Sequence, residues 1–210
     1  MTKKKINSGF KKSKLDGTEY IYSSTIATIP EKYSYKKYLP KVLNQGLDPI
    51  CIPCSISAYI NLILNSKTGK KEDNKIAYFD IYNSKTIEGE GMTFKEAFSY
   101  LKHNGVKTKN CIFKIHTYSM IKSSLALKSA IIMNGPCFGA LPVYNDTNDF
   151  WIKRNGDTLL GYHAIAIVGY DPNGFIIRNS WGESYGDEKG YHHIKTEDFN
   201  KFIELWTIVN

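Results

Sequence analysis

The amino-acid sequence predicts an α+β protein with two lobes, a mainly helical one followed by a mainly β one. In the first half of the chain, apolar side chains recur at helical spacing. In the second half, short segments rich in β-branched and aromatic residues are separated by Gly, Asn, Asp and Pro. The 210 residues, 42% of them hydrophobic, suit one domain or two lobes that share an interface. Helices followed by strands are typical of the α+β class.

The first predicted helix covers residues 53–64 and places a cysteine at its beginning. Pro53 suits a first turn, where its missing N–H costs nothing, so Cys51 lies at or just before the helix N-terminus. Unpaired N–H groups and the helix macrodipole favour a thiolate at such a position. An isolated cysteine is more often a buried structural residue, so a catalytic assignment depends on what accompanies it.

Two further helices follow along the chain. Thr93 and Glu96 form a capping-box pattern at the start of a helix over residues 93–103, and Gly105 marks its end. A third helix is predicted near residues 123–133, ending at Gly135-Pro136.

The predicted strands bring a histidine and an asparagine together. The turn at 171–174 joins two of them as antiparallel neighbours, which places His163 at the start of one strand close to Asn179 at the end of the next. We therefore expect these two side chains to be hydrogen-bonded. The strand segments are 137–144, 163–170, 174–179, 190–194 and 205–209.

The net charge of +8 does not predict nucleic-acid binding. Of 28 basic residues only Arg154 and Arg178 are arginine, the usual reader of phosphates and bases. The lysines are scattered apart from a group at the N-terminus, which we interpret as a solvated tail. That group is Lys3, Lys4, Lys5, Lys11, Lys12 and Lys14.

The sequence lacks both a membrane span and a secretory signal. No apolar run approaches the length of a spanning helix, and the first residues are polar. We expect a cytoplasmic location, with association with a virus particle as a second possibility. The four cysteines do not form a disulfide scaffold and are expected to be reduced thiols.

Two other interpretations of the cysteines and histidines fit the sequence less well. Cys51 and Cys54 form a Cys-x-Pro-Cys sequence, as in thioredoxin-type oxidoreductases, but the residues before them are polar and irregular rather than a buried strand. A zinc site would need a second ligand pair at recognisable spacing. His192 and His193 point to opposite faces of a strand and are predicted to lie on the surface. No metal or organic cofactor is implied.

Several spaced motifs indicate a known family. Gln45-Gly46 precedes Cys51 by six residues, and His163-Ala164 precedes Asn179-Ser180-Trp181-Gly182 by sixteen. With these motifs the chain resembles papain-like cysteine peptidases, in particular bacterial and viral members without a long pro-segment. The resemblance is patchy but runs from about residue 8 to the end. It departs from the family pattern at Ile52, where tryptophan is usual, and in lacking the cysteine of one family disulfide.

The resemblance implies a catalytic role for four residues. Cys51 would be the nucleophile, His163 its general base and acid, and Asn179 the group that orients the histidine. The Gln45 side chain and the Cys51 backbone N–H would form the oxyanion hole. The implied substrate-binding residues are Gly91, Met92, Thr93, Ala140, Tyr162, Ala164 and Trp181. Four of these line a pocket that we expect to prefer a bulky apolar side chain, and Trp181 would shield the His163–Asn179 bond from water.

The resemblance also implies a papain-like two-lobed fold, with a helical lobe, an antiparallel β-barrel-like lobe and an active-site cleft between them. Residues 1–25 would be a basic N-terminal extension and 26–210 the peptidase domain, helical over about 45–115 and β over about 116–205. The expected function is that of a cysteine endopeptidase, a monomer acting on peptides or proteins, with no nucleic-acid or membrane partner. The alternatives are a catalytically silent peptide-binding module, an acyltransferase and, less favoured, the thiol-disulfide oxidoreductase.

Overall fold

The computed structural model describes residues 9–24 and 26–209, and the chain folds into helices packed on both faces of one antiparallel sheet. The α-helices are α1 (Cys51–Thr68), α2 (Tyr78–Tyr82), α3 (Phe94–His103) and α4 (Ser124–Asn134), and the 3-10 helices are η1 (Lys36–Tyr38) and η2 (Thr196–Lys201). The strands are β1 (Tyr33–Ser34), β2 (Val106–Lys107), β3 (Ile112–Phe113), β4 (Thr117–Met120), β5 (Cys137–Val143), β6 (Gly161–Asp171), β7 (Gly174–Arg178), β8 (Tyr191–Ile194) and β9 (Glu204–Val209).

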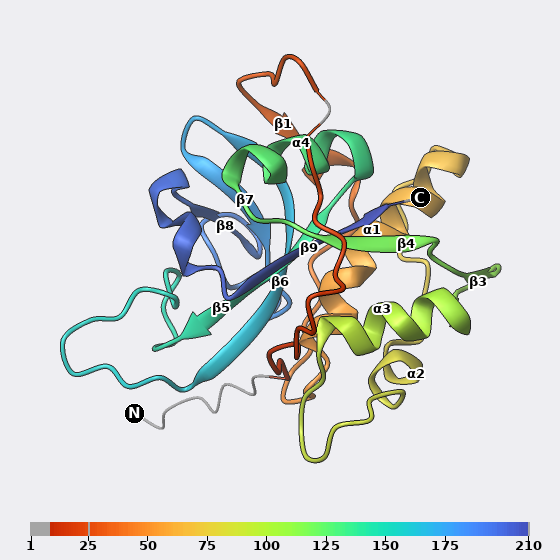
Figure 1. Cartoon of the computed structure of the whole chain (residues 1–210), viewed down its shortest axis with the longest axis horizontal. Helices are drawn as coiled ribbons and strands as arrows, with labels where there is room; N and C mark the ends of the chain where they lie inside the picture. The colour runs from red at the N-terminus through yellow and green to blue at the C-terminus, as the bar shows by residue number, and fades with distance from the viewer. Residues whose placement is uncertain (1–8, 25, 210) are drawn as a thin grey trace.

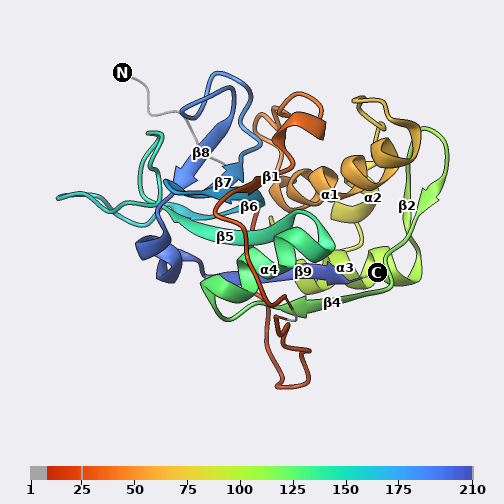
Figure 2. The same ribbon diagram turned by 90° about the horizontal axis from the view of Figure 1, so that it is seen from above.

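The main sheet has seven strands in the order β4-β9-β5-β6-β7-β8, with β1 paired to β6. Figures 1 and 2 show α1, α2 and α3 grouped beside one part of this sheet, whereas α4 lies on the face opposite α1. Side chains alternate along β6 in agreement with this arrangement: Ala164 packs with the α1 core, while Ile165 and Ile167 pack with the α4 core. The predicted α+β fold class is confirmed, although over the described residues the sheet is open at β4 and β8 rather than a closed barrel.

The three helices expected from the sequence are confirmed. Helix α1 begins at Cys51 and ends before Gly69, whose left-handed backbone (φ 67°) is accessible to glycine and lets its N–H bond to Asn65. Helix α3 begins with the predicted capping box, in which Thr93 and Glu96 satisfy one another's backbone N–H groups.

The long strands were also predicted to within a few residues, whereas the short elements were not. Strands β1 to β4 and helix α2 hold two to five residues each, too few for a periodic pattern to emerge. Their formation depends on neighbours distant in the sequence, as when β4 pairs with β9 at the C-terminus.

The N-terminal segment crosses the folded body before reaching β1. Phe10 forms a parallel bridge with Met92, and Ile21 forms one with Met120 at the end of β4. Figure 1 shows this red segment crossing in front of β4, past α3. The predicted solvated tail is therefore correct for the exposed side chains of Lys12 and Lys14, whereas Lys11 is half-buried and its backbone N–H pairs with Met92. Lys3 to Lys5 lie outside the described residues. No helix among residues 9–24 and 26–209 is long and apolar enough to cross a membrane.

Candidate active site

Cys51 is the first residue of α1 and has no exposed surface. Burial raises the pKa of its thiol to about 11. The backbones of Ala164, Gly9 and Ile52 oppose this shift by favouring the thiolate. The sulfur therefore lies beside the residue that follows His163, and in this arrangement it carries its proton at neutral pH.

His163 and Asn179 meet at the end of the β6–β7 hairpin, as the sequence predicted. His163 Nε2 lies 2.8 Å from Asn179 Oδ1, and both side chains are buried. The backbone N–H of Ser180 donates a second hydrogen bond to the same oxygen, at 2.7 Å. Burial lowers the pKa of His163 to about 4, against the opposing effect of the Asn179 hydrogen bond. Nδ1 of His163 is buried without a hydrogen bond among the described residues.

An aromatic wall covers this pair. The Trp181 ring stacks on the His163 ring with a centroid distance of 4.3 Å and an interplanar angle of 27°. Phe150 packs against Trp181 at 4.8 Å and against the edge of His163 at 5.9 Å. These contacts exclude water from the His163–Asn179 bond, which strengthens it electrostatically.

Gln45 is held in place by Ser180, the residue next to Asn179. Ser180 Oγ donates to Gln45 Oε1 at 2.6 Å, and the Gln45 backbone N–H donates to the Ser180 carbonyl at 2.8 Å. Gln45 Nε2 donates to the Asp48 carbonyl at 2.8 Å. Sequence reasoning missed this role of Ser180, although its place directly after Asn179 in the motif was a signal that could have found it.

The N-terminal segment occupies the predicted substrate pocket. Phe10 is 4% exposed and belongs to the same apolar cluster as Cys51, Met92 and Ala164. Its ring packs against Tyr162 at 6.2 Å. Phe10 thus shares one buried cluster with Met92, Ala140 and Ala164 of the predicted pocket. Thr93 is the buried N-cap of α3, directly before Phe94, whose ring also contacts Phe10 at 5.7 Å.

Backbone pairing holds this segment in the cleft. The Met92 N–H donates to the Gly9 carbonyl at 2.9 Å, and the Lys11 N–H donates to the Met92 carbonyl at 2.8 Å. A Cβ atom on Gly91 would lie 3.0 Å from the Gly9 oxygen, and one on Gly9 would lie 2.1 Å from the Pro49 oxygen. A side chain at Gly91 would therefore crowd the Gly9 carbonyl, and one at Gly9 would collide with the Pro49 backbone. The predicted approach of a substrate backbone to Gly91 stays a prediction.

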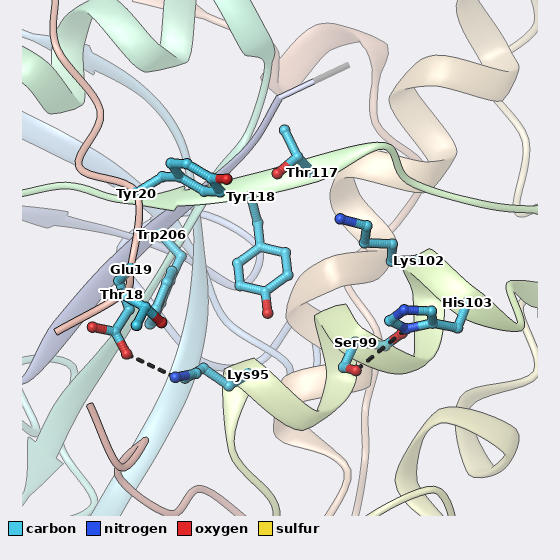
Figure 3. A pocket seen from close by; sticks show the side chains of 10 residues that line it. All are labelled: Thr18, Glu19, Tyr20, Lys95, Ser99, Lys102, His103, Thr117, Tyr118 and Trp206. Atoms are coloured by element: carbon cyan, nitrogen blue, oxygen red, sulfur yellow. Dashed lines mark hydrogen bonds and ion pairs between the residues drawn. The ribbon is translucent and has the colours of Figure 1, made fainter. Parts of the chain in front are cut away.

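Side chains anchor the segment farther along. Ser13 Oγ donates to the buried carboxylate of Glu204 at 3.0 Å, and burial raises the pKa of that carboxyl group. Lys95 of α3 pairs with Glu19 at 2.7 Å and with Asp16 at 3.3 Å. Figure 3 shows the Lys95–Glu19 pair at the rim of a cavity of about 210 Å³ between the segment, α3 and β4. This cavity is lined by other residues than those around Cys51.

His192 departs from the sequence prediction. It is 1% exposed, and its Nε2 lies 3.3 Å from Asn179 Nδ2, so the prediction of a surface position is wrong for this residue. His193 does point to the other face, where it contacts Asp171 at 3.1 Å and its side chain is 36% exposed. The predicted alternation of the two histidines along β8 is confirmed. His192 lies on the interior face, because the loop that carries Phe150 and Trp151 covers that face.

The remaining cysteines are not part of the group formed by Cys51, His163 and Asn179. Cys54 is 5% exposed, and burial strongly raises the pKa of its thiol. Cys137 is likewise buried, and Cys111 is exposed; all four cysteines are free thiols.

Comparison with known proteins gives one consistent result. The family described as "Papain family cysteine protease" matches residues 55–204, more than half of the chain. A cathepsin B-like protein, CP1 of Giardia intestinalis, is 23% identical over 79% of this chain and 68% of its own length. The crystal structure of xylellain, a cysteine protease from Xylella fastidiosa, has a TM-score of 0.80 at 22% identity and covers 99% of this chain and 97% of its own. The structure of proCathepsin B S9 from Trypanosoma congolense has a TM-score of 0.77 at 14% identity, covering 97% and 87%.

Proposed function

Because the chain belongs to the papain family of cysteine proteases, we propose that it hydrolyses peptide bonds through an acyl-thioester on Cys51. The observation that carries this proposal is the buried 2.8 Å hydrogen bond between His163 and Asn179. This bond leaves Nδ1 of His163 without a hydrogen bond to any residue that the structure describes. The next residue in the chain, Ala164, contacts the Cys51 sulfur through its backbone. A histidine so oriented has one nitrogen committed to Asn179 and the other available to a thiol.

The reaction would proceed through two acyl-transfer steps. His163 takes the Cys51 proton, and the thiolate attacks the substrate carbonyl to form a tetrahedral intermediate. His163 then protonates the leaving amine, and water attacks the thioester in the second step. The developing oxyanion would be bound by the Cys51 backbone N–H and by Gln45, whose amide has a second N–H beyond the one given to Asp48.

The form described here would be a resting one. Phe10 and Gly9 lie over Cys51, which has no exposed surface and whose pKa is about 11. A substrate can reach the sulfur only after this segment leaves, and water and the N-terminus of α1 then favour the thiolate. The division into an extension over residues 1–25 and a domain over 26–210 remains part of this proposal.

The pocket around Phe10 supports a preference for a bulky apolar side chain at the second residue before the scissile bond. Met92, Ala140 and Ala164 are small or apolar and belong to the same buried cluster as Phe10. A peptide library profiled by cleavage would show enrichment of Phe, Leu or Tyr at that position. Enrichment of Arg or Lys instead would overturn this assignment and would indicate that the buried Glu204, which pairs with Ala140 in the sheet, sets the preference.

The experiment that tests the proposed function is mass spectrometry after treatment with an epoxide cysteine-peptidase inhibitor. Wild type should gain one adduct on Cys51, and His163→Ala should gain none. The exposed Cys111 serves as an internal control, since iodoacetamide should label it equally in both proteins. Equal epoxide labelling of Cys51 in the two proteins would contradict the role of His163.

The other functions predicted for this site can be separated by their products. An acyltransferase would pass the acyl group to an added amine, a silent module would bind peptide without turnover, and an oxidoreductase would cycle a Cys51–Cys54 disulfide. The last is the least supported, because it has no use for the His163–Asn179 pair. Family membership implies peptide or protein substrates. A monomeric state, a cytoplasmic or virion location and the lack of nucleic-acid or membrane partners remain predictions.

A further inference from the structure

We propose that His192 is a positioning residue of the active site, which accepts a hydrogen bond from the Asn179 amide and so fixes the end of that amide that faces His163. This inference rests on the proposed function, in which Asn179 orients the catalytic histidine. It adds His192 as a fourth residue to the series Cys51, His163 and Asn179 that the sequence motifs name.

The sheet places His192 on the catalytic face. In the β7–β8 ladder His192 stands opposite Ile177, and Asn179 lies two residues beyond Ile177, so the two side chains project to the same side. His163 shares this side, because Ile167 pairs with Ile177 and lies four residues after His163 along β6. The three side chains are 0 to 3% exposed, so water does not compete for their hydrogen bonds.

The hydrogen-bond inventory of Asn179 leaves one consistent orientation. Its Oδ1 accepts from His163 Nε2 at 2.8 Å and from the Ser180 N–H at 2.7 Å, and its Nδ2 lies 3.3 Å from His192 Nε2. A neutral His192 protonated on Nδ1 offers a lone pair at Nε2, which can only accept. With the amide reversed, its carbonyl would face that lone pair and its N–H groups would face the Ser180 donor.

The tautomer of His163 follows from this orientation. Because Asn179 presents an acceptor, His163 must carry its proton on Nε2, which leaves Nδ1 free to accept the proton of Cys51. His192 therefore acts through Asn179 without touching the reacting atoms. A buried histidine with a merely structural role would fill space between Phe150 and Trp151, whose rings pack edge-on against it with centroids 6.0 Å away.

The charged and polar groups around His192 determine the pH range in which its Nε2 can accept the hydrogen bond from Asn179. The Asp187 carboxylate and the Asn148 backbone favour the charged ring, although Nδ1 has no hydrogen bond of normal geometry within the described part of the chain. Burial has the larger effect and lowers the pKa of His192, and the charge of His193 acts in the same direction. On protonation, Nε2–H would face the Asn179 N–H, and a second cation would oppose the imidazolium of His163. Activity should therefore fall at acid pH through His192 as well as through His163.

Three variants of the full chain test this role. His192→Phe keeps an aromatic filler without an acceptor, and His192→Gln keeps an acceptor that does not titrate. His193→Phe changes the neighbouring residue on the other face of β8. The readouts are kcat/KM for a fluorogenic peptide and the alkylation rate of Cys51 by iodoacetamide, both as a function of pH, with the Tm of each variant.

We expect His192→Phe to lose about 10-fold or more in both rates at pH 7, in line with the loss of one buried hydrogen bond. His192→Gln should restore most of that loss and shift the acid limb of the profile to lower pH, and His193→Phe should match the wild-type rates at pH 7. Wild-type rates and pH dependence in His192→Phe would overturn the proposal, as would a His192→Gln variant no better than His192→Phe.

A second measurement does not depend on turnover. In wild-type protein with ¹⁵N-labelled histidine, the ring nitrogen shifts at pH 7 should show His192 protonated on Nδ1 and unprotonated on Nε2. A proton on Nε2 would overturn the proposal even if the enzyme is active. If no peptide is cleaved, the proposed function fails, while the tautomer still decides the position of His192.

Discussion

The end of the β6–β7 hairpin that bears His163 and Asn179 and the N-terminal segment that packs beside Cys51 are held in different ways. His163 lies in β6 and Asn179 directly follows β7, two strands joined by an antiparallel ladder with one irregularity between Ile167 and Gly169, and the hydrogen bonds of the two side chains are buried. The segment from Gly9 to Ile21 contacts the body at separate points: isolated bridges at Phe10 and Ile21, the Ser13–Glu204 hydrogen bond, and the ion pairs of Lys95 with Asp16 and Glu19.

This difference separates a permanent site from a removable cover. Disrupting the hairpin would require breaking several ladder hydrogen bonds together with the cores on both faces of the sheet. Lifting the segment loses the burial of Phe10, the backbone pairing to Met92 and Met120 and the buried Ser13–Glu204 hydrogen bond, but it leaves the ladders of β6 and β7 intact. In the proposed mechanism, Cys51 would therefore become exposed while the contact between His163 and Asn179 stays in place.

The strongest test within the permanent site is Gln45→Ala. It removes the side-chain donor proposed for the oxyanion and should lower kcat/KM for peptide hydrolysis about 100- to 1000-fold. Alkylation of Cys51 by iodoacetamide forms no oxyanion, so its rate should change little. A parallel loss of both rates would mean that Gln45 instead maintains the local fold through Ser180.

The pH dependence of stability tests how deeply His163 is buried. Its pKa is about 4 in the folded protein against an ordinary 6.5, so the unfolded chain binds the proton first as the pH falls. The free energy of unfolding should therefore decrease between pH 6.5 and pH 4, by about 3 kcal/mol from this residue. Urea unfolding at pH 7 and pH 4.5 measures the change, which should shrink in His163→Ala but not in a variant of the exposed His103. An unchanged dependence in His163→Ala would contradict the assignment.

Phe10→Ala tests the cover directly. Burial of a phenylalanine contributes about 1.5–3 kcal/mol, so its loss should raise the iodoacetamide labelling rate of Cys51 by about 10- to 100-fold. Tyr20→Ala is the matched control, since Tyr20 belongs to the same segment but is 72% exposed. If both variants label at the wild-type rate, the segment does not limit access to the sulfur.

Thr93→Ala should have the smallest effect. It removes the N-cap of α3, the helix that follows the Gly91-Met92 wall of the cleft, and should cost about 1 kcal/mol, or about 2–4 °C in Tm. Calorimetry measures this change, and Thr93→Ser should restore the stability because serine also caps. A loss of activity much larger than the loss of stability would point to a direct contact between Thr93 and substrate.

Residue pattern alone suffices for the parts of the protein that depend on local geometry. Helical spacing and Pro53 predict α1 with Cys51 at its start, and a short turn between two strands brings His163 to Asn179, because both features involve residues near one another in the sequence.

Only the folded chain shows what depends on distant partners. Phe10 meets Met92 across 82 positions of the sequence, Gln45 meets Ser180 across 135, and His192 turns inward because a separate loop covers that face of β8. A strand pattern predicts that adjacent histidines lie on opposite faces, but which face is buried depends on packing against other elements. Tertiary packing therefore decided that the site is covered, which side chain fills the pocket, and which histidine supports Asn179.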